Sequence, residues 1–66
     1  MNISLLMTGN ELMSGDTIDS NSSLIAQSLS KYGFDIHSKI TIGDDINHIV
    51  NKLENLLLDS KIIIIN

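Results

Sequence analysis

The chain has no cysteine, proline, arginine or tryptophan among its 66 residues, and it has one tyrosine and one phenylalanine. Without cysteine there can be no disulfide bond and no thiolate metal site, so nothing indicates an oxidising compartment. Four lysines stand against eight Asp and Glu residues, which gives a net charge of −4. Because nucleic acids and anionic membrane surfaces are bound largely through Lys and Arg, this balance argues against both as partners.

Long hydrophobic runs are also absent. No apolar stretch approaches the roughly 18 residues of a membrane-spanning helix, and the start, Met1–Ser4, lacks the charged segment of a signal peptide. We therefore expect a soluble, cytoplasmic protein. A chain of this length buries only about 60% of the surface that it exposes when unfolded, so its stability as one small domain is expected to be marginal.

The hydrophobic pattern predicts five elements in the order β-α-β-α-β. Residues 3–7 form a short, almost wholly apolar stretch that ends before Gly9, which is typical of a strand buried on both faces. Residues 9–17 are rich in Asn, Ser, Asp and Gly and are predicted to form a loop. Across residues 19–32 the apolar side chains follow a helical period. Their stripe consists of Ile18, Ile25, Leu29 and Tyr32.

The second half of the chain repeats this order. Residues 34–42 alternate between apolar and polar side chains, which predicts a strand with one face in water, near a sheet edge. Its apolar face carries Phe34, Ile36, Ser38, Ile40 and Ile42. Asp44 or Asp45 is expected to cap a second helix, as Asp19 or Ser20 caps the first. The stripe of that helix consists of Ile46, Ile49, Val50, Leu53, Leu56 and Leu57.

These elements predict an α/β fold. Short strand–helix–strand connections give right-handed crossovers, a parallel sheet and helices over its faces. Four consecutive isoleucines, Ile62–Ile65, are typical of a central strand, which needs a neighbour on each side. We therefore expect residues 1–66 to be the N-terminal half of a larger three-layer αβα domain. The alternative is a last strand that is completed by dimerisation.

Polar residues gather where ligands of parallel α/β sheets bind, at the carboxyl ends of the strands. Residues 8–21, 42–45 and 66 onward are expected to lie there. The first two of these segments carry five of the eight acidic residues and none of the four lysines. The five are Glu11, Asp16, Asp19, Asp44 and Asp45. Such an acidic rim can hold a divalent cation that is shared with substrate phosphates, or the aspartates can simply cap helices.

Two other features are less specific. Gly9 and Gly15 bracket a strand-to-helix loop of the kind whose backbone N–H groups cradle phosphates, but the spacing matches neither a Walker loop nor the dinucleotide fingerprint. His37 and His48 lie on a predicted strand and a predicted helix without a cysteine partner, so we expect solvated side chains rather than zinc ligands.

The segment Thr8–Asn21, T-G-N-E-L-M-S-G-D-T-I-D-S-N, resembles the opening of the molybdopterin-binding (MoaB/Mog-like) domain family, and it is most similar to the N-terminal part of CinA (competence/damage-inducible) proteins. That pattern has T-G-x-E-L-L-x-G, D-T-N, Leu-x-x-x-Gly and V-G-D-D, which correspond here to residues 8–15, 19–21, 29–33 and 42–45. The departures are Met13 for Leu, Ser20 for Thr and Ile42 for Val. The resemblance covers essentially the whole chain.

The resemblance implies a longer, αβα-layered and often homo-oligomeric domain that binds molybdopterin or another phosphorylated pterin or nucleotide. For CinA-like proteins it implies ADP-ribose pyrophosphatase activity with a divalent cation such as Mg²⁺. The family continues after the third strand with a glycine-rich T-G-G-x-G segment, which we expect to be missing after Asn66, so that the chain alone is inactive. The ligand-binding positions that carry over are Gly9, Glu11, Gly15, Asp19, Asn21, Gly43, Asp44 and Asp45.

Three functions remain open on this basis. In the first, Glu11 and the Asp44–Asp45 pair orient hydrated Mg²⁺ while residues 9–15 and the helix start at Asp19 hold a phosphorylated ligand. In the second, the chain is a non-enzymatic interaction module that pairs through an exposed Ile62–Ile65 strand with a second copy or a separately encoded second half. The third is a receiver-like phosphoacceptor, in which the acidic pair should follow the first strand rather than the second.

Overall fold

The strand β1 (Ile3–Thr8) runs through the middle of the computed structural model, which describes residues 2–66. Two further strands, β2 (Ile36–Ile42) and β3 (Ile62–Ile65), pair with it on either side. Both pairings are parallel, and the strand order is β2-β1-β3. The predicted parallel α/β fold is therefore confirmed.

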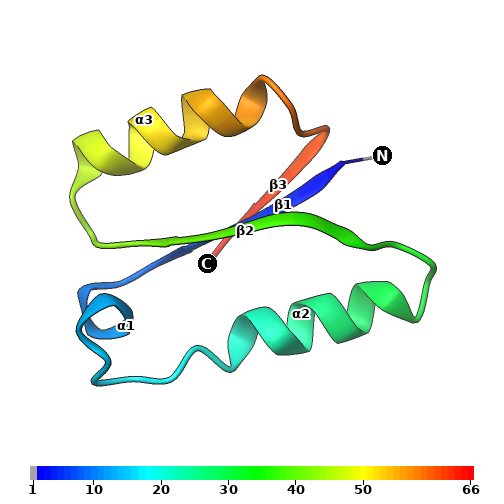
Figure 1. Ribbon diagram of the computed structural model, residues 1–66, viewed down its shortest axis with the longest axis horizontal. Coiled ribbons are helices and arrows are strands. Elements are labelled where there is room, and N and C mark those ends of the chain that lie inside the picture. Colours follow the sequence, from blue (N-terminus) through cyan, green and yellow to red (C-terminus); the bar gives the residue numbers. More distant parts are fainter. Residues whose placement is uncertain (1) are drawn as a thin grey trace.

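The helices lie on both faces of this sheet. Figure 1 views the sheet along the direction that joins its strands, with α3 (Ile46–Leu57) on one side and α2 (Asn21–Ser30) on the other. The short helix α1 (Asn10–Ser14) lies on the same side as α2. The molecule measures 32 × 27 × 12 Å, so the sheet is narrow and the three layers are open along its two edges. None of the helices within residues 2–66 is long and apolar enough to cross a membrane.

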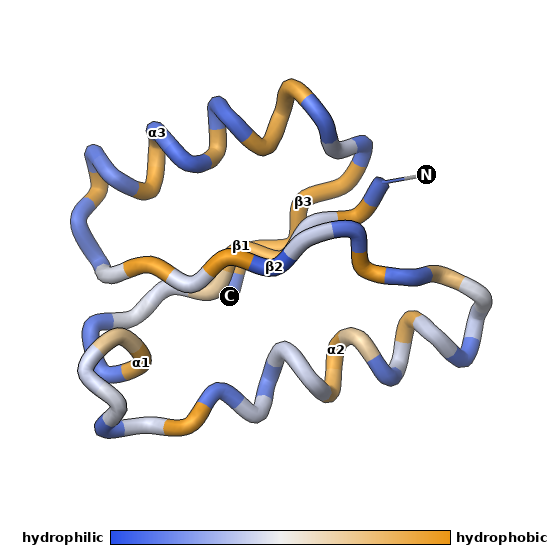
Figure 2. The backbone as a smooth tube through the Cα atoms, in the orientation of Figure 1, coloured by the Kyte–Doolittle hydropathy of each residue, from blue (hydrophilic) through white to orange (hydrophobic). Residues whose placement is uncertain are grey.

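The main core lies between the sheet and α3. Leu6, Ile42 and Leu56 form its buried centre. Partly buried side chains from β2, α3 and β3 surround it, namely Ile40, Ile49, Leu53 and Ile63. Figure 2 shows why α3 packs against the sheet: apolar and polar residues alternate along the helix, so that one apolar stripe can face the strands. The predicted stripe holds for these residues, whereas Ile46, Val50 and Leu57 are exposed.

The α2 face is packed more loosely. Leu5 and Met7 of β1 are buried on this face, but the one fully buried side chain of α2 is that of Ser22. The predicted apolar stripe is wrong for two residues, because Ile18 is 87% exposed and Tyr32 is 79% exposed. Ile18 precedes α2 in the connecting loop, and Tyr32 lies beyond its last turn. Neither position shares the face that the helical period predicted.

A bulge changes the face of one residue in β2. The register steps from Ile3 opposite Ile36 to Ser4 opposite Ser38, which leaves His37 as an extra residue. Ile36 is consequently turned toward α2, where it lines a cavity with Leu5. The prediction that Ile36 shares a face with Ser38 is therefore wrong, since simple alternation cannot anticipate a bulge. The predicted edge position of β2 is confirmed.

Serine hydroxyls complete the α3 face at the amino ends of the strands. The side chain of Ser4 is fully buried in β1. Its Oγ lies 3.0 Å from Ser38 Oγ and 2.5 Å from Ser60 Oγ. These contacts satisfy a buried polar group that would otherwise destabilise the fold, and they tie β2 and the segment just before β3 to β1.

We expect the central strand to dominate stability. Leu6→Ala should lower the free energy of unfolding by about 2–5 kcal/mol, because it empties space in the core beside Ile42 and Leu56. Leu58→Ala is the matched control, since Leu58 is 87% exposed, and it should change stability by less than about 0.5 kcal/mol. Urea unfolding followed by circular dichroism measures both. Equal midpoints for the two variants would contradict a core centred on Leu6.

Candidate functional site

The connection after β1 contains a helix that the sequence pattern did not predict. Residues 9–17 were expected to form a loop, but Asn10–Ser14 forms α1. Glu11, Leu12 and Met13 are good helix formers, and Gly15 ends the helix with a φ of 86°. The two glycines that suggested a loop are thus the boundaries of one helical turn. Gly15 is exposed and does not line the cavity at the ends of the strands.

Gly9 places the carboxylate of Glu11. Its N–H donates to the carbonyl of Ile42 at 3.0 Å, which joins the ends of β1 and β2. Its φ is 152°, and a Cβ at this position would lie 2.7 Å from Glu11 Oε1. Only glycine leaves room for that carboxylate to fold back over the end of β1. Within the T-G-x-E segment, Gly9 and the side chain of Glu11 therefore lie close together in space as well as in sequence.

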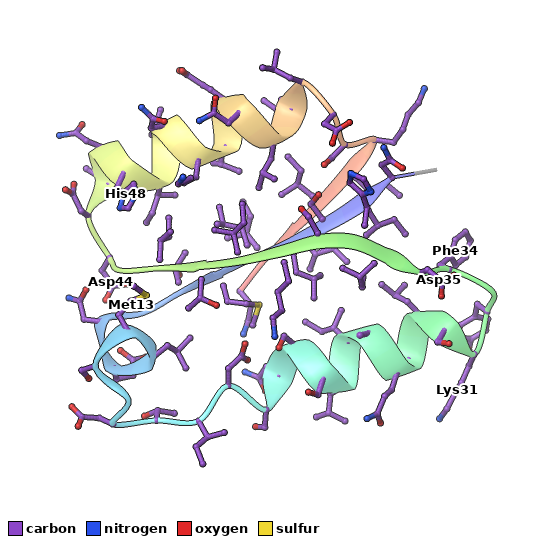
Figure 3. The ribbon with its side chains drawn as sticks, in the orientation of Figure 1. Met13, Lys31, Phe34, Asp35, Asp44 and His48 are labelled. Carbon is purple, nitrogen blue, oxygen red and sulfur yellow. The ribbon has the colours of Figure 1, made fainter. Side chains whose placement is uncertain are left out.

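Asn10 and Asp44 fasten α1 to the end of β2. The backbone N–H of Asn10 donates to Asp44 Oδ2 at 3.3 Å, and the backbone N–H of Asp44 donates to Asn10 Oδ1 at 3.0 Å. Gly43 allows this approach, because a Cβ there would lie 2.6 Å from Asn10 Oδ1. Figure 3 shows Asp44 beside α1, whereas Lys31 lies at the opposite end of the molecule.

Asp45 caps α3, as predicted for one residue of the acidic pair. Its Oδ1 accepts a hydrogen bond from the backbone N–H of Asn47 at 3.0 Å. Neither Asp44 nor Asp45 lines the cavity at the strand ends. The two aspartates are thus engaged in holding α1 and starting α3, and the structure does not bring them together with Glu11 at one cavity.

A cavity of about 180 Å³ lies at the carboxyl ends of β1 and β3. It brings together Glu11, Asp19 and Asn21, three of the predicted site residues. The other polar residues that line it are Thr8, Thr17, Ser20 and Asn66, and the apolar ones are Met7, Leu12 and Ile18. Carboxylates, hydroxyls and amides thus converge on one small space, and no lysine or histidine of the described chain lines it.

Asn66 is held in this wall by β1. Its carbonyl accepts hydrogen bonds from Thr8 N at 2.9 Å and Thr8 Oγ1 at 3.2 Å. Its N–H donates to the carbonyl of Leu6 at 3.1 Å. The expectation that residue 66 lies with residues 8–21 at the carboxyl edge of the sheet is therefore confirmed.

Asp19 lies two residues before α2 and also lines the cavity. Its Oδ1 accepts from Ser22 N at 3.1 Å, as expected of a helix cap. Its Oδ2 is buried and has no hydrogen-bond partner within residues 2–66. The Ser22 hydroxyl, then the Ser22 N–H, lower the pKa of the Asp19 carboxyl, and Lys39 adds to this shift while burial opposes it. Asp19 is thus an ionised carboxylate with one unused oxygen.

Lys39 is the residue that sequence reasoning missed. It was placed in the middle of a strand, away from the candidate site, but its Nζ donates to Ser22 Oγ at 3.3 Å. The backbone N–H of Ser22 in turn donates to Asp19 Oδ1, and the Ser22 hydroxyl also lowers the pKa of the Asp19 carboxyl. The alternation of β2 does predict that Lys39 faces away from Ile40. It could not show that the first turn of α2 lies over that face, because this depends on how α2 packs.

The donor set suits a hard divalent cation. Mg²⁺ is usually bound through one or two carboxylates together with waters and substrate phosphates, and Glu11 and Asp19 line the same cavity. The unpartnered Oδ2 of Asp19 is an oxygen of the required kind. No cluster of three or more His, Cys, Asp or Glu residues that could hold a metal occurs within residues 2–66. A site here would therefore depend on further ligands.

The link from Lys39 through Ser22 to Asp19 can be tested by titration. Ser22→Ala and Lys39→Met should each raise the pKa of Asp19, with the larger effect for Ser22→Ala, when the Asp19 carboxyl carbon is followed by NMR. Ser23→Ala is the matched control and should leave the titration unchanged. Because the folded pKa lies below the ordinary value of 3.8, the ionised carboxylate stabilises the fold above that pH. The contribution is lost as the pH falls through the folded value. An Asp19 titration that is the same in all variants would contradict the link.

The matches to known proteins agree with this fold. A family model described as "Probable molybdopterin binding domain" matches residues 4–66. A CinA-like protein of Colwellia psychrerythraea is 45% identical over 97% of this chain, and one of Flavobacterium psychrophilum is 40% identical over 94%. The chain spans only 15% and 14% of the length of these two relatives.

A solved structure agrees as well. The crystal structure of CinA from Thermoplasma acidophilum, described as a protein of unknown function, superposes with a TM-score of 0.88 at 25% identity. It covers 97% of this chain, and this chain covers 38% of it. The chain therefore belongs to the probable molybdopterin binding domain family, and its sequence and fold are similar to those of a corresponding region of CinA-like proteins.

Proposed function

We propose that the cavity at the ends of β1 and β3 binds part of a phosphorylated pterin or nucleotide together with a divalent cation. In the intact protein this site would serve hydrolysis of the ADP-ribose pyrophosphatase type. The observation that carries the proposal is the meeting of Glu11 and Asp19, with one buried and unpartnered carboxylate oxygen, at the edge of the sheet where α/β proteins bind ligands.

The size and chemistry of the cavity favour the binding of one part of such a ligand rather than the whole molecule. Sites for whole ligands typically measure about 300–1,000 Å³, whereas this cavity measures about 180 Å³. Carboxylates accept hydrogen bonds and repel anions, so Glu11 and Asp19 favour ribose hydroxyls or the N–H groups of a pterin ring. A phosphate group at the same place requires a cation between it and the carboxylates.

Glu11 and Asp19 would hold that cation. When bound, it would neutralise the charge of the phosphate oxygens. Other residues of this chain would keep the two carboxylates ready to bind the cation. Ser22 keeps the Asp19 carboxylate ionised, and Gly9 leaves room for the Glu11 carboxylate. Asp44 and Asp45 would act indirectly, by fixing α1 and α3.

We expect the 66-residue chain to bind the ligand without hydrolysing it. Cleavage of a pyrophosphate depends on cationic groups that stabilise the developing negative charge. No Lys or His side chain lines the cavity within residues 2–66. Such groups would have to come from beyond this region, which spans a minor part of the relatives.

Binding of ADP-ribose tests this proposal. Calorimetric titration in Mg²⁺ should show binding that Glu11→Gln weakens about tenfold or more, as expected for the loss of one charge-assisted contact. Glu54→Gln is the matched control, since Glu54 is an exposed residue of α3 on the other side of the sheet. Equal affinities for the two variants, or binding that does not depend on Mg²⁺, would contradict the proposed site.

A further inference from the structure

A second cavity lies between α2 and the sheet, beside β2. Its volume is about 250 Å³, and it shares no lining residue with the cavity at the strand ends. The residues that line it are Leu5, Ser22, Ser23, Ala26, Ile36 and Lys39. Although the chain has eight acidic residues and four lysines, this lining includes one lysine and, within residues 2–66, no carboxylate. The cavity therefore differs in charge from the candidate site described above.

The bulge in β2 gives this cavity two of its walls. Lys39 pairs directly with Leu5 of β1, and the shift in register puts Ile36 on that same face of the sheet. An apolar side chain and a lysine from β2 thus line one space with Leu5. The facing wall is formed by α2, whose Ser22 and Ala26 lie four residues apart and share one side of the helix. Because these side chains are short, they leave the space between helix and strands unfilled.

Lys39 brings a positive charge with unused hydrogen-bond donors to this cavity. An ammonium group has three donors, and within residues 2–66 the Nζ of Lys39 donates to Ser22 Oγ at 3.3 Å and to no other side chain. Lys39 forms no ion pair in the same part of the chain, where the ion pair that does form joins His37 and Asp59. Since Ser22 is 2% exposed, this hydrogen bond holds the charge against a buried group in the wall of the cavity.

We propose that this cavity binds a small organic monoanion, namely a carboxylate attached to an apolar body about the size of one ring, with the carboxylate on Lys39. The apolar body packs against Leu5 and Ile36, and the hydroxyl of Ser23 is a further donor for the carboxylate. The size is appropriate, because an apolar cavity of about 150 Å³ can hold benzene and this one measures about 250 Å³.

A carboxylate suits the cavity better than a phosphate does. Its single charge matches the one lysine of the lining, whereas a phosphate dianion is better held by several cationic donors. The cavity at the strand ends is lined by Glu11 and Asp19, and it repels a free carboxylate because like charges repel. A monoanion therefore distinguishes the two cavities, and this inference does not depend on the ligand that is proposed for the first.

Binding of benzoate tests the proposal. Sodium benzoate is titrated into the 66-residue chain at constant ionic strength while the backbone amides are followed by NMR, and benzamide, which has a similar shape without the charge, is titrated separately. We expect benzoate to shift the amide signals of the lining residues saturably, with a Kd in the low millimolar range, and benzamide to bind at least about tenfold more weakly. Shifts that do not saturate, equal affinities for the two compounds, or equal shifts with inorganic phosphate would each overturn the proposal.

Two variants locate the binding site. Lys39→Met removes the charge but keeps a long side chain, and it should weaken benzoate binding at least about tenfold. Ala26→Leu keeps the charge but fills the cavity, and it should abolish the saturable shifts. Lys52→Met is the matched control, since Lys52 lies on α3, on the other side of the sheet (Figure 1). Circular dichroism shows which variants remain folded, and a folded Lys39→Met or Ala26→Leu chain that binds benzoate as tightly as the control would overturn the assignment.

Discussion

The structure depends on β1, which is buried on both faces and paired on both edges. Ile3, Leu5, Leu6 and Met7 are at most 2% exposed, and the strand is parallel to β2 on one side and to β3 on the other. Because β2 and β3 do not contact each other in the sheet, they are held in register only through β1. The helices that cover the two faces are connected to these strands, so the arrangement of all three layers follows from this one element.

The candidate site is a consequence of the same arrangement. The ends of all three strands meet because β1 lies between the others, with Gly9 bonded to the end of β2 and Thr8 bonded to Asn66 after β3. The acidic residues then divide between two kinds of task. Asp44 and Asp45 fix helices, whereas Glu11 and Asp19 face the cavity. Asp19 does both, since one carboxylate oxygen accepts a hydrogen bond from the first turn of α2 and the other has no partner within residues 2–66.

Much of this fold could be predicted from hydrophobic periodicity, because apolar runs and alternation report burial directly. The predicted strands and the two long helices exist, and the carboxyl edge was assigned to the correct segments. The wrong predictions have local causes. Gly9 and Gly15 flank a short helix rather than a loop, and the bulge at His37 turns Ile36 to the other face of the sheet. The site was harder to predict. Whether an aspartate at a strand end caps a helix or faces a ligand depends on its side-chain direction, and Lys39 joins the network only through the packing of α2.

The central role of β1 can be measured by native-state hydrogen exchange of the 66-residue chain, resolved by NMR. The amides of residues 5–7 should be the slowest to exchange, since they open only when both neighbouring strands are lost, and those of α1 should be among the fastest. If instead β1 exchanges as fast as α1 while β2 or β3 stays protected, the sheet is not organised around β1. The strand ends, and the cavity between them, would then owe their position to some other element.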